Sequence, residues 1–167
     1  KGIIKTNKVV LASGIWGPLI GDMAGVPIPL SPLEHPLLFF GPLPEIQKTD
    51  ELLVYPLLRD QGNSAYVRDT GRLHGGMLEW GFYEDKNPRL IDPGEIGDPE
   101  KSQTSPSMRH LSLDEIAEPL EKALETTPIL NDLGWDERNS FNGLLSVTAD
   151  AGSLIGESPE VRGFWLC

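Results

Sequence analysis

A histidine, a tyrosine and two arginines are the side chains of this 167-residue chain whose types and positions suggest chemistry. His35 follows Glu34 in an extended segment bounded by prolines, and an imidazole can accept or relay a proton near neutral pH. Tyr66 and Arg68 alternate around Val67, so on a strand both point to one face. A hydroxyl and a guanidinium on one face can bind a carboxylate, which arginine holds through two parallel hydrogen bonds.

Each of these residues also has a structural interpretation. His35 fits a surface or hydrogen-bonded structural histidine, and Tyr66 with Arg68 fits a solvated strand face. Arg59 is a candidate second anion clamp, but an arginine followed by an aspartate, here Asp60, also stabilises turns at strand ends.

Aromatic side chains gather near a glycine-rich strand. The faces of Trp80, Phe82 and Tyr83 would attract a methylated ammonium group. Core packing is the favoured interpretation, because the three glycines between positions 75 and 81 indicate close backbone approach or a bulge rather than a cage.

The first apolar run, residues 8–17, predicts a strand that ends at a tight turn and leads into a helix over 17–25. Pro18 stands where the first turn of a helix tolerates proline. In an open α/β sheet, ligands bind beyond the carboxyl ends of the strands, where glycine allows close approach. This turn is therefore a candidate cofactor edge.

The remaining elements predict an α+β chain, with a mainly antiparallel sheet and flanking helices in addition to an edge of an α/β domain. A hairpin is expected over 2–11, and the prolines between 26 and 44 predict an extended, irregular stretch. A polar loop is expected over 85–111. Further strands are expected near 37–40, 52–58, 64–69, 72–83, 138–146 and 161–166.

One helix has a clear start signal. Residues Ser112–Glu115 form a capping box, and apolar residues then recur at helical spacing from Leu113 to Leu124. Thr126-Thr127-Pro128 ends the pattern. This helix should lie on one face of the sheet.

The composition opposes several partners. With 14 basic and 25 acidic residues the net charge is −11, which opposes binding to nucleic acid or anionic membranes. No apolar run approaches the roughly 20 residues that span a bilayer. One cysteine and three histidines without ligand spacing give no disulfide and no metal site, which fits a reducing compartment, cytoplasmic or mitochondrial matrix.

Short motifs follow one another in a fixed order along the chain. The first is Val-Val-x-Ala-x-Gly-x-Trp over 9–16, before an apolar helix. The others lie at 23–26, 32–35, 58–60, 66–68, 75–76, 81–84, 142–150, 155–159 and 163–165. Their ordered occurrence resembles the FAD-dependent amine oxidoreductases of the D-amino-acid oxidase superfamily, and within it the branch of the dimethylglycine and sarcosine dehydrogenases.

This resemblance implies FAD as the cofactor and an N-methylated or secondary amino acid as the substrate, oxidised by hydride transfer to the flavin. It places His35 where a family histidine faces the substrate amine, and it supports Tyr66 as the second catalytic residue more firmly than Arg68. Arg68 and Arg59 are then the predicted substrate-binding residues. Water, or tetrahydrofolate bound by a domain outside this chain, would capture the iminium product.

The resemblance assigns cofactor contacts to both ends of the chain. They are Ala12, Gly14, Trp16, Gly17, Thr148, Asp150 and Gly156. Two prolines of the family pattern are replaced here by Ala149 and Leu154, which loosens the second turn.

The resemblance also implies a middle-to-late part of a larger flavoenzyme, inactive by itself. A Gly-x-Gly-x-x-Gly turn for the FAD pyrophosphate does not occur in the chain. Residues 1–25 are expected to be an edge of the FAD-binding domain, 26–140 the substrate-binding sheet domain, and 141–167 the return toward the FAD-binding domain.

Two alternatives stay open. One is a non-catalytic relative that acts through protein partners, like the regulatory subunit of pyruvate dehydrogenase phosphatase. The other is a binding module without flavin. A hydrolase or a phosphate-loop protein is not indicated, because neither Gly-x-Ser-x-Gly nor a Gly-Lys-Ser/Thr loop occurs.

Overall fold

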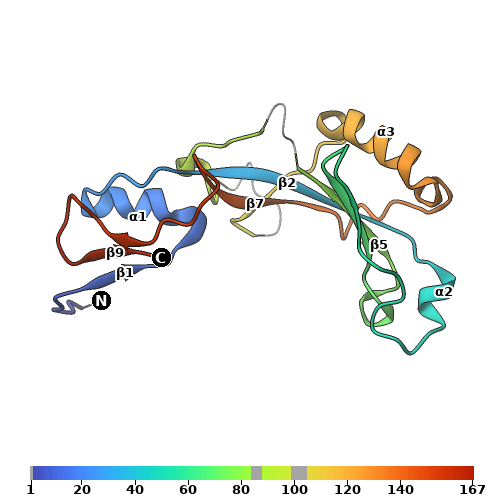
Figure 1. The fold of residues 1–167 in the computed structure, drawn as a ribbon, viewed down its shortest axis with the longest axis horizontal. Helices are drawn as coiled ribbons and strands as arrows, with labels where there is room; N and C mark the ends of the chain where they lie inside the picture. The colour runs from blue at the N-terminus through green and yellow to red at the C-terminus, as the bar shows by residue number, and fades with distance from the viewer. Residues whose placement is uncertain (1, 84–87, 99–104) are drawn as a thin grey trace.

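The computed structural model describes residues 2–83, 88–98 and 105–167, and it shows an elongated molecule with two sheets (Figure 1). The larger sheet has the strand order β3-β4-β5-β2-β7-β6, and all of its neighbouring strands are antiparallel. Its strands are β2 (Leu30–Phe40), β3 (Leu58–Asp60), β4 (Ala65–Asp69), β5 (Leu78–Phe82), β6 (Met108–Arg109) and β7 (Phe141–Thr148). The smaller sheet consists of β1 (Val9–Leu11), β9 (Phe164–Leu166) and β8 (Gly156–Glu157), in that order. The predicted α+β class is confirmed.

Strands β2 and β7 form a long ribbon that joins the two ends of the molecule (Figure 1). They pair from Leu30 opposite Thr148 to Leu37 opposite Phe141. Only the last part of β2, Leu37–Phe40, also pairs with β5. The first half of β2 thus lies near the small sheet, and its second half lies within the larger one.

The expectation of an irregular stretch over 26–44 was wrong, because β2 is a regular strand that contains Pro32 and Pro36. The backbone N–H of Glu34 donates to the Arg89 carbonyl (3.0 Å), on the side of β2 away from β7. N–H directions alternate along a strand, so the nitrogens of both prolines also face away from β7. Their missing N–H groups therefore remove no hydrogen bond from the β2–β7 pairing.

Three other strand predictions need correction. Residues 52–57 are not a strand, because the Asp69 carboxylate accepts the backbone N–H groups of Val54 (2.9 Å) and Tyr55 (2.6 Å) in place of a neighbouring strand. The range 72–83 is a strand only over β5, since positive φ angles at Gly71 and Gly75 turn the chain through the 3₁₀ helix η2 (Arg72–His74). No hairpin forms over 2–11, because β1 pairs in parallel with β9 from the other end of the chain.

Helix α1 (Gly17–Ala24) agrees with the prediction, with a proline in its first turn and Gly25 at φ 71° after its last residue. Helix α3 (Ala117–Thr126) begins later than the capping box predicts, after the 3₁₀ helix η4 (Asp114–Ile116), and no side chain caps it. Pro119 explains the shift. In a helix starting at 113 its ring would clash with the carbonyl of residue 115, whereas in the first turn no intrahelical N–H is required.

The core lies on one face of the larger sheet, under α3. Leu38, Trp80 and Phe82 are buried there against Ile116 and Ala123. The expected helix on one sheet face is confirmed, as is the core packing of Trp80 and Phe82. Short elements that complete the fold are η1 (Gly14–Trp16), α2 (Pro44–Gln47), η3 (Pro93–Glu95) and η5 (Pro128–Asp132).

The expected polar loop over 85–111 contains backbone pairing in its described parts. Leu90 forms a bridge with Leu33, and β6 pairs with β7. Lys1, Glu84 and the loop residues 85–87 and 99–104 lie outside the described residues. Across the described ranges, none of the helices has the length and apolarity to cross a membrane. The predicted domain limits stay a prediction.

Candidate functional site

His35 and Tyr66 meet on the face of the larger sheet opposite the core. His35 Nε2 lies 3.0 Å from the Tyr66 hydroxyl, although β5 separates their strands. Gly81 of β5 is in register with Tyr66 on one side and with Leu37 on the other. A Cβ at position 81 would overlap the phenol ring at Cζ and the hydroxyl oxygen. The missing side chain is what allows Tyr66 to lie across β5 and reach His35.

The surroundings fix the protonation of this pair. Burial lowers the pKa of His35, and a hydrogen bond with the Phe82 backbone opposes that effect in part. Burial also raises the pKa of Tyr66 to about 12, with added contributions from Tyr83 and Glu79. Near neutral pH the imidazole is therefore neutral and the phenol keeps its proton. A neutral base beside a hydroxyl donor is the result.

Tyr83 and Arg59 extend this arrangement. The Tyr83 ring centre lies 4.7 Å from that of His35 and 6.0 Å from that of Tyr66. The Arg59 guanidinium lies over the Tyr83 ring, 5.2 Å from the ring centre. Arg59 is also the partner of Tyr66 in the β3–β4 pairing. One face thus brings together an imidazole, two phenols and a guanidinium.

Arg68 lies on the same face but has a partner of its own. Its Nε forms an ion pair with Glu79, whose side chain is buried. Alternation along β4 is confirmed, since Ala65, Val67 and Asp69 are buried and the residues between them are not. The substrate-binding role of Arg68 stays a prediction, and its contact with Glu79 leaves it less available than Arg59.

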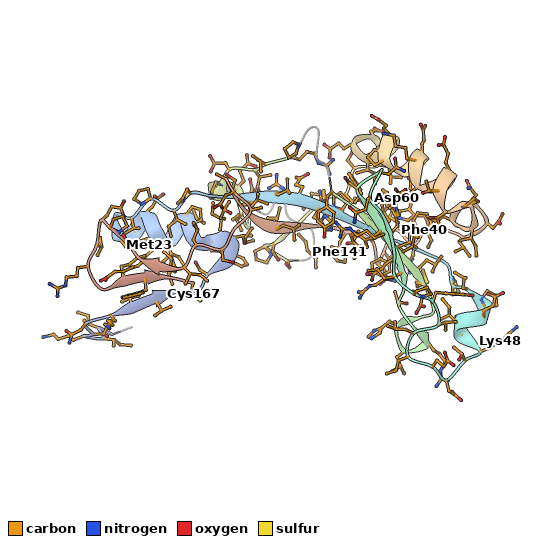
Figure 2. All side chains as sticks on the ribbon, viewed as in Figure 1. Met23, Phe40, Lys48, Asp60, Phe141 and Cys167 are labelled. Atoms are coloured by element: carbon orange, nitrogen blue, oxygen red, sulfur yellow. The ribbon has the colours of Figure 1, made fainter. Side chains whose placement is uncertain are left out.

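A groove of about 340 Å³ opens beside His35. Its lining is mostly apolar and consists of His35, Leu37, Ser107, Met108, Phe141, Gly143, Leu144 and Leu145. Gly143 stands directly opposite His35 in the β2–β7 pairing and leaves the imidazole open toward this space. Figure 2 places Phe141 near the middle of the molecule, between the small sheet and α3.

A second hollow, of about 250 Å³, lies where the small sheet meets the β2–β7 ribbon. Three of the predicted cofactor contacts line it: Gly14, Gly17 and Thr148. Ser13 also lines it, and its Oγ is buried without a hydrogen-bond partner among the described residues. An unpaired buried hydroxyl beside glycines suits a polar cofactor edge. The residues present therefore fit part of an FAD site.

The other predicted cofactor contacts lie outside this lining. Ala12 and Trp16 are exposed, and Gly156 pairs with Leu166 in the small sheet. Asp150 accepts hydrogen bonds from the Thr148 hydroxyl (3.1 Å) and the Gly152 N–H (2.9 Å) within the turn. Their cofactor contacts stay a prediction.

Core packing, the favoured interpretation of Tyr83, was wrong, because Tyr83 is exposed and contacts His35 on the face opposite the core. Sequence reasoning missed Ser13 as a site residue. Tyr83 follows Gly81 by two positions, so strand alternation places both on one face. That signal was present, but nothing in the sequence shows that β4 and β2 flank β5. Across the described residues, no group of three potential ligands that could hold a metal ion occurs.

Comparison with known proteins gives one family. The model of the family described as "DAO: FAD dependent oxidoreductase" matches residues 1–167. Dimethylglycine dehydrogenase, mitochondrial, from Rattus norvegicus is 28% identical over 99% of this chain and 18% of its own length. Sarcosine dehydrogenase, mitochondrial, from Mus musculus is 32% identical over 99% of this chain and 16% of its own length. The chain thus spans less than a fifth of these curated relatives.

Solved structures show the same fold. L-proline dehydrogenase from P. horikoshii matches with a TM-score of 0.69 and 23% identity, over 99% of this chain and 37% of that one. Glycine oxidase from Geobacillus kaustophilus matches with a TM-score of 0.62 and 19% identity, over 95% of this chain and 35% of that one.

Proposed function

Because this chain belongs to the family of FAD-dependent oxidoreductases, we propose that it is the substrate-binding part of an enzyme that oxidises an N-methylated or secondary amino acid. The observation that carries the proposal is the contact between His35 and Tyr66 at the edge of a groove. When bound, FAD supplies the acceptor for the hydride that leaves the carbon next to nitrogen. The residues of this chain supply binding and proton handling.

His35 prepares the amine. An amino acid reaches the site mainly as an ammonium ion, which must lose a proton before the neighbouring carbon can release a hydride. A neutral imidazole can accept that proton, and its lowered pKa keeps it neutral near pH 7. Tyr66, whose hydroxyl stays protonated, donates its hydrogen bond to the substrate carboxylate when substrate is bound, which leaves Nε2 of His35 free to accept the proton.

Substrate and cofactor sites follow one another along β7. Gly143, Leu144 and Leu145 line the groove beside His35. Ser146 and Thr148, a few residues further on, line the hollow that fits the cofactor. Ser13, Gly14 and Thr148 would hold an edge of FAD there. One strand can therefore fix the amine relative to the cofactor, which hydride transfer requires.

The names of the relatives support the substrate class. Besides the two dehydrogenases, a 30% identical protein of Paenarthrobacter nicotinovorans is named 4-methylaminobutanoate oxidase (formaldehyde-forming). Dimethylglycine, sarcosine and 4-methylaminobutanoate all combine an N-methylated amine with a carboxylate. Capture of the product by tetrahydrofolate, and a location in the mitochondrial matrix or the cytoplasm, are parts of the same proposal. The intact His35–Tyr66 contact favours catalysis over the non-catalytic regulatory role.

The test uses the full-length enzyme that contains these residues, loaded with FAD. In anaerobic stopped-flow experiments with sarcosine and dimethylglycine, His35→Ala should slow flavin reduction and change its pH dependence. Tyr66→Phe should mainly weaken substrate binding, by about ten- to a hundredfold, because one hydrogen bond to a charged group is lost. Reduction of both variants at the parental rate, with the parental dissociation constant and pH profile, would contradict the proposal.

A further inference from the structure

We propose that Arg59, held over the ring of Tyr83, is the carboxylate anchor of this site and makes it select amino acids over simple amines. This inference rests on the proposed function, because it names how the same site recognises its substrate. It assigns Tyr83, which directly follows β5, as a positioning residue.

Arg59 is available for a ligand. Its neighbour Asp60 is engaged in the turn, where its carboxylate accepts the backbone N–H (3.2 Å) and the side-chain amide (2.7 Å) of Asn63. The turn-stabilising role expected for the Arg59–Asp60 pair therefore belongs to Asp60 and Asn63. Within the described part of the chain, no carboxylate forms an ion pair with Arg59.

Arg68 is the competing candidate, and its surroundings argue against it. Glu79 lies beside Arg68 on β5, in direct register with it, and forms an ion pair with its Nε. A substrate carboxylate would have to displace a buried glutamate, which would then lose its partner at a high cost. The chain thus offers one engaged and one available guanidinium on the same sheet face.

Tyr83 gives the Arg59 guanidinium a fixed place. When an arginine stacks on an aromatic ring, the flat face of its guanidinium contacts the ring face. The N–H groups of the guanidinium then point outward, in the plane of the guanidinium. That edge can still bind a carboxylate through two parallel hydrogen bonds. The same Tyr83 ring contacts His35, so it sets the separation between the cation and the base.

This separation suits a short substrate. The Arg59 guanidinium and the His35 ring centre lie 5.2 and 4.7 Å from the Tyr83 ring centre, so they are within about 10 Å of each other. Hydrogen bonds at both ends take up several ångströms each. A molecule whose amine and carboxylate are one to three carbons apart fits the remainder.

The experiment uses the full-length FAD enzyme and a probe without an amine, so that its outcome does not depend on turnover. Propanoate carries the carboxylate, and propanamide is its uncharged counterpart. Binding of each is followed by the change in flavin absorbance. Arg59→Gln should weaken propanoate binding by about ten- to a hundredfold and leave propanamide unchanged, because only the charge-assisted hydrogen bonds are lost. Arg59→Lys should restore part of the affinity.

The position of Tyr83 is tested in the same assay. Tyr83→Phe keeps the ring and should bind propanoate like the parent, whereas Tyr83→Ala should weaken binding several-fold because the guanidinium loses its platform. Arg72→Gln is the matched control: Arg72 pairs with Asp50 on the surface, so its variant should bind both probes normally.

The results separate the two proposals. Parental propanoate binding by Arg59→Gln would overturn the anchor, and its loss in Arg68→Gln instead would assign the carboxylate to Arg68. If no N-methylated amino acid reduces the flavin of the parent enzyme while propanoate binding still depends on Arg59, the proposed function fails and the anchor stands.

Discussion

Replacing Gly81 by alanine should disrupt the site through a single methyl group. A Cβ at this position would lie 2.8 Å from Cε1 of the Tyr66 ring and would overlap its Cζ and hydroxyl oxygen. The backbone of β5 is paired on both sides and cannot move away. Tyr66 must therefore lift off the sheet, which breaks its hydrogen bond with His35.

The size of the effect follows from two opposing contributions. Overfilling a packed site costs about 1–3 kcal/mol. Alanine in a strand is itself favoured over glycine by about 0.5–1 kcal/mol, because glycine loses more freedom on folding. In a Tyr66→Ala background the overlap is absent, so Gly81→Ala should there be neutral or slightly stabilising. The sign of the change in unfolding free energy should differ between the two backgrounds.

The assay is a double-mutant cycle in the full-length enzyme, measured by thermal unfolding and by flavin reduction. Gly143→Ala is the matched control for the thermal measurement alone, because a Cβ there meets Phe141 and the His35 carbonyl only at 3.6 Å or more, which is ordinary contact, whereas Gly143 also lines the groove beside His35. Equal costs of Gly81→Ala in the parental and the Tyr66→Ala backgrounds would refute this account of how Tyr66 reaches His35.

Three more predictions concern single groups. Burial lowers the pKa of His35 below 6.5, so the unfolded chain binds this proton more readily than the folded protein does. The free energy of unfolding should therefore fall as the pH drops below about 6.5. His35→Gln should flatten this pH dependence in urea titrations between about pH 5 and 8. Asp69→Asn should lower the free energy of unfolding by about 3 kcal/mol, because the buried carboxylate accepts three backbone N–H groups; Asp50→Asn, in an exposed pair, should change it by less than about 0.5 kcal/mol. Ser13→Ala should weaken FAD binding about fivefold in titrations, at an unchanged thermal midpoint of the cofactor-free protein, if its buried unpaired hydroxyl faces the cofactor.

The sequence predicted those parts of the fold that depend on local rules. Helix α1 with its early proline, and the common face of Tyr66 and Arg68, follow from periodicity and backbone geometry alone. Helix α3 shows how two local rules conflict: the capping box favours a start at 113, but Pro119 moves the start of the helix to 117. The expectation that prolines exclude a regular strand was wrong at β2. That expectation counts the missing N–H groups but ignores which side of the strand they would face.

The site itself depended on information that no local rule contains. His35 and Tyr66 are 31 residues apart, and their contact requires that β5 lie between β4 and β2 with a glycine in one particular register. The same register places Glu79 beside Arg68. Strand order therefore decides which of two similar arginines is engaged and which is available, although the sequence offers both as candidates.

The position of His35 is also fixed from the opposite face of β2. The carboxylate of Glu34, next in the chain, forms ion pairs with Arg89 (3.0 Å) and Arg109 (3.5 Å), and all three side chains are largely buried. Arg109 also forms an ion pair with Glu95 (3.2 Å). This ion pair connects the segment after β5 to the β2–β7 ribbon. Such pairs add little net stability, but breaking one leaves a buried charge without its partner. Their contribution is to resist displacement of β2, so that the imidazole one residue further on keeps its distance to Tyr66 when a charged substrate enters the groove.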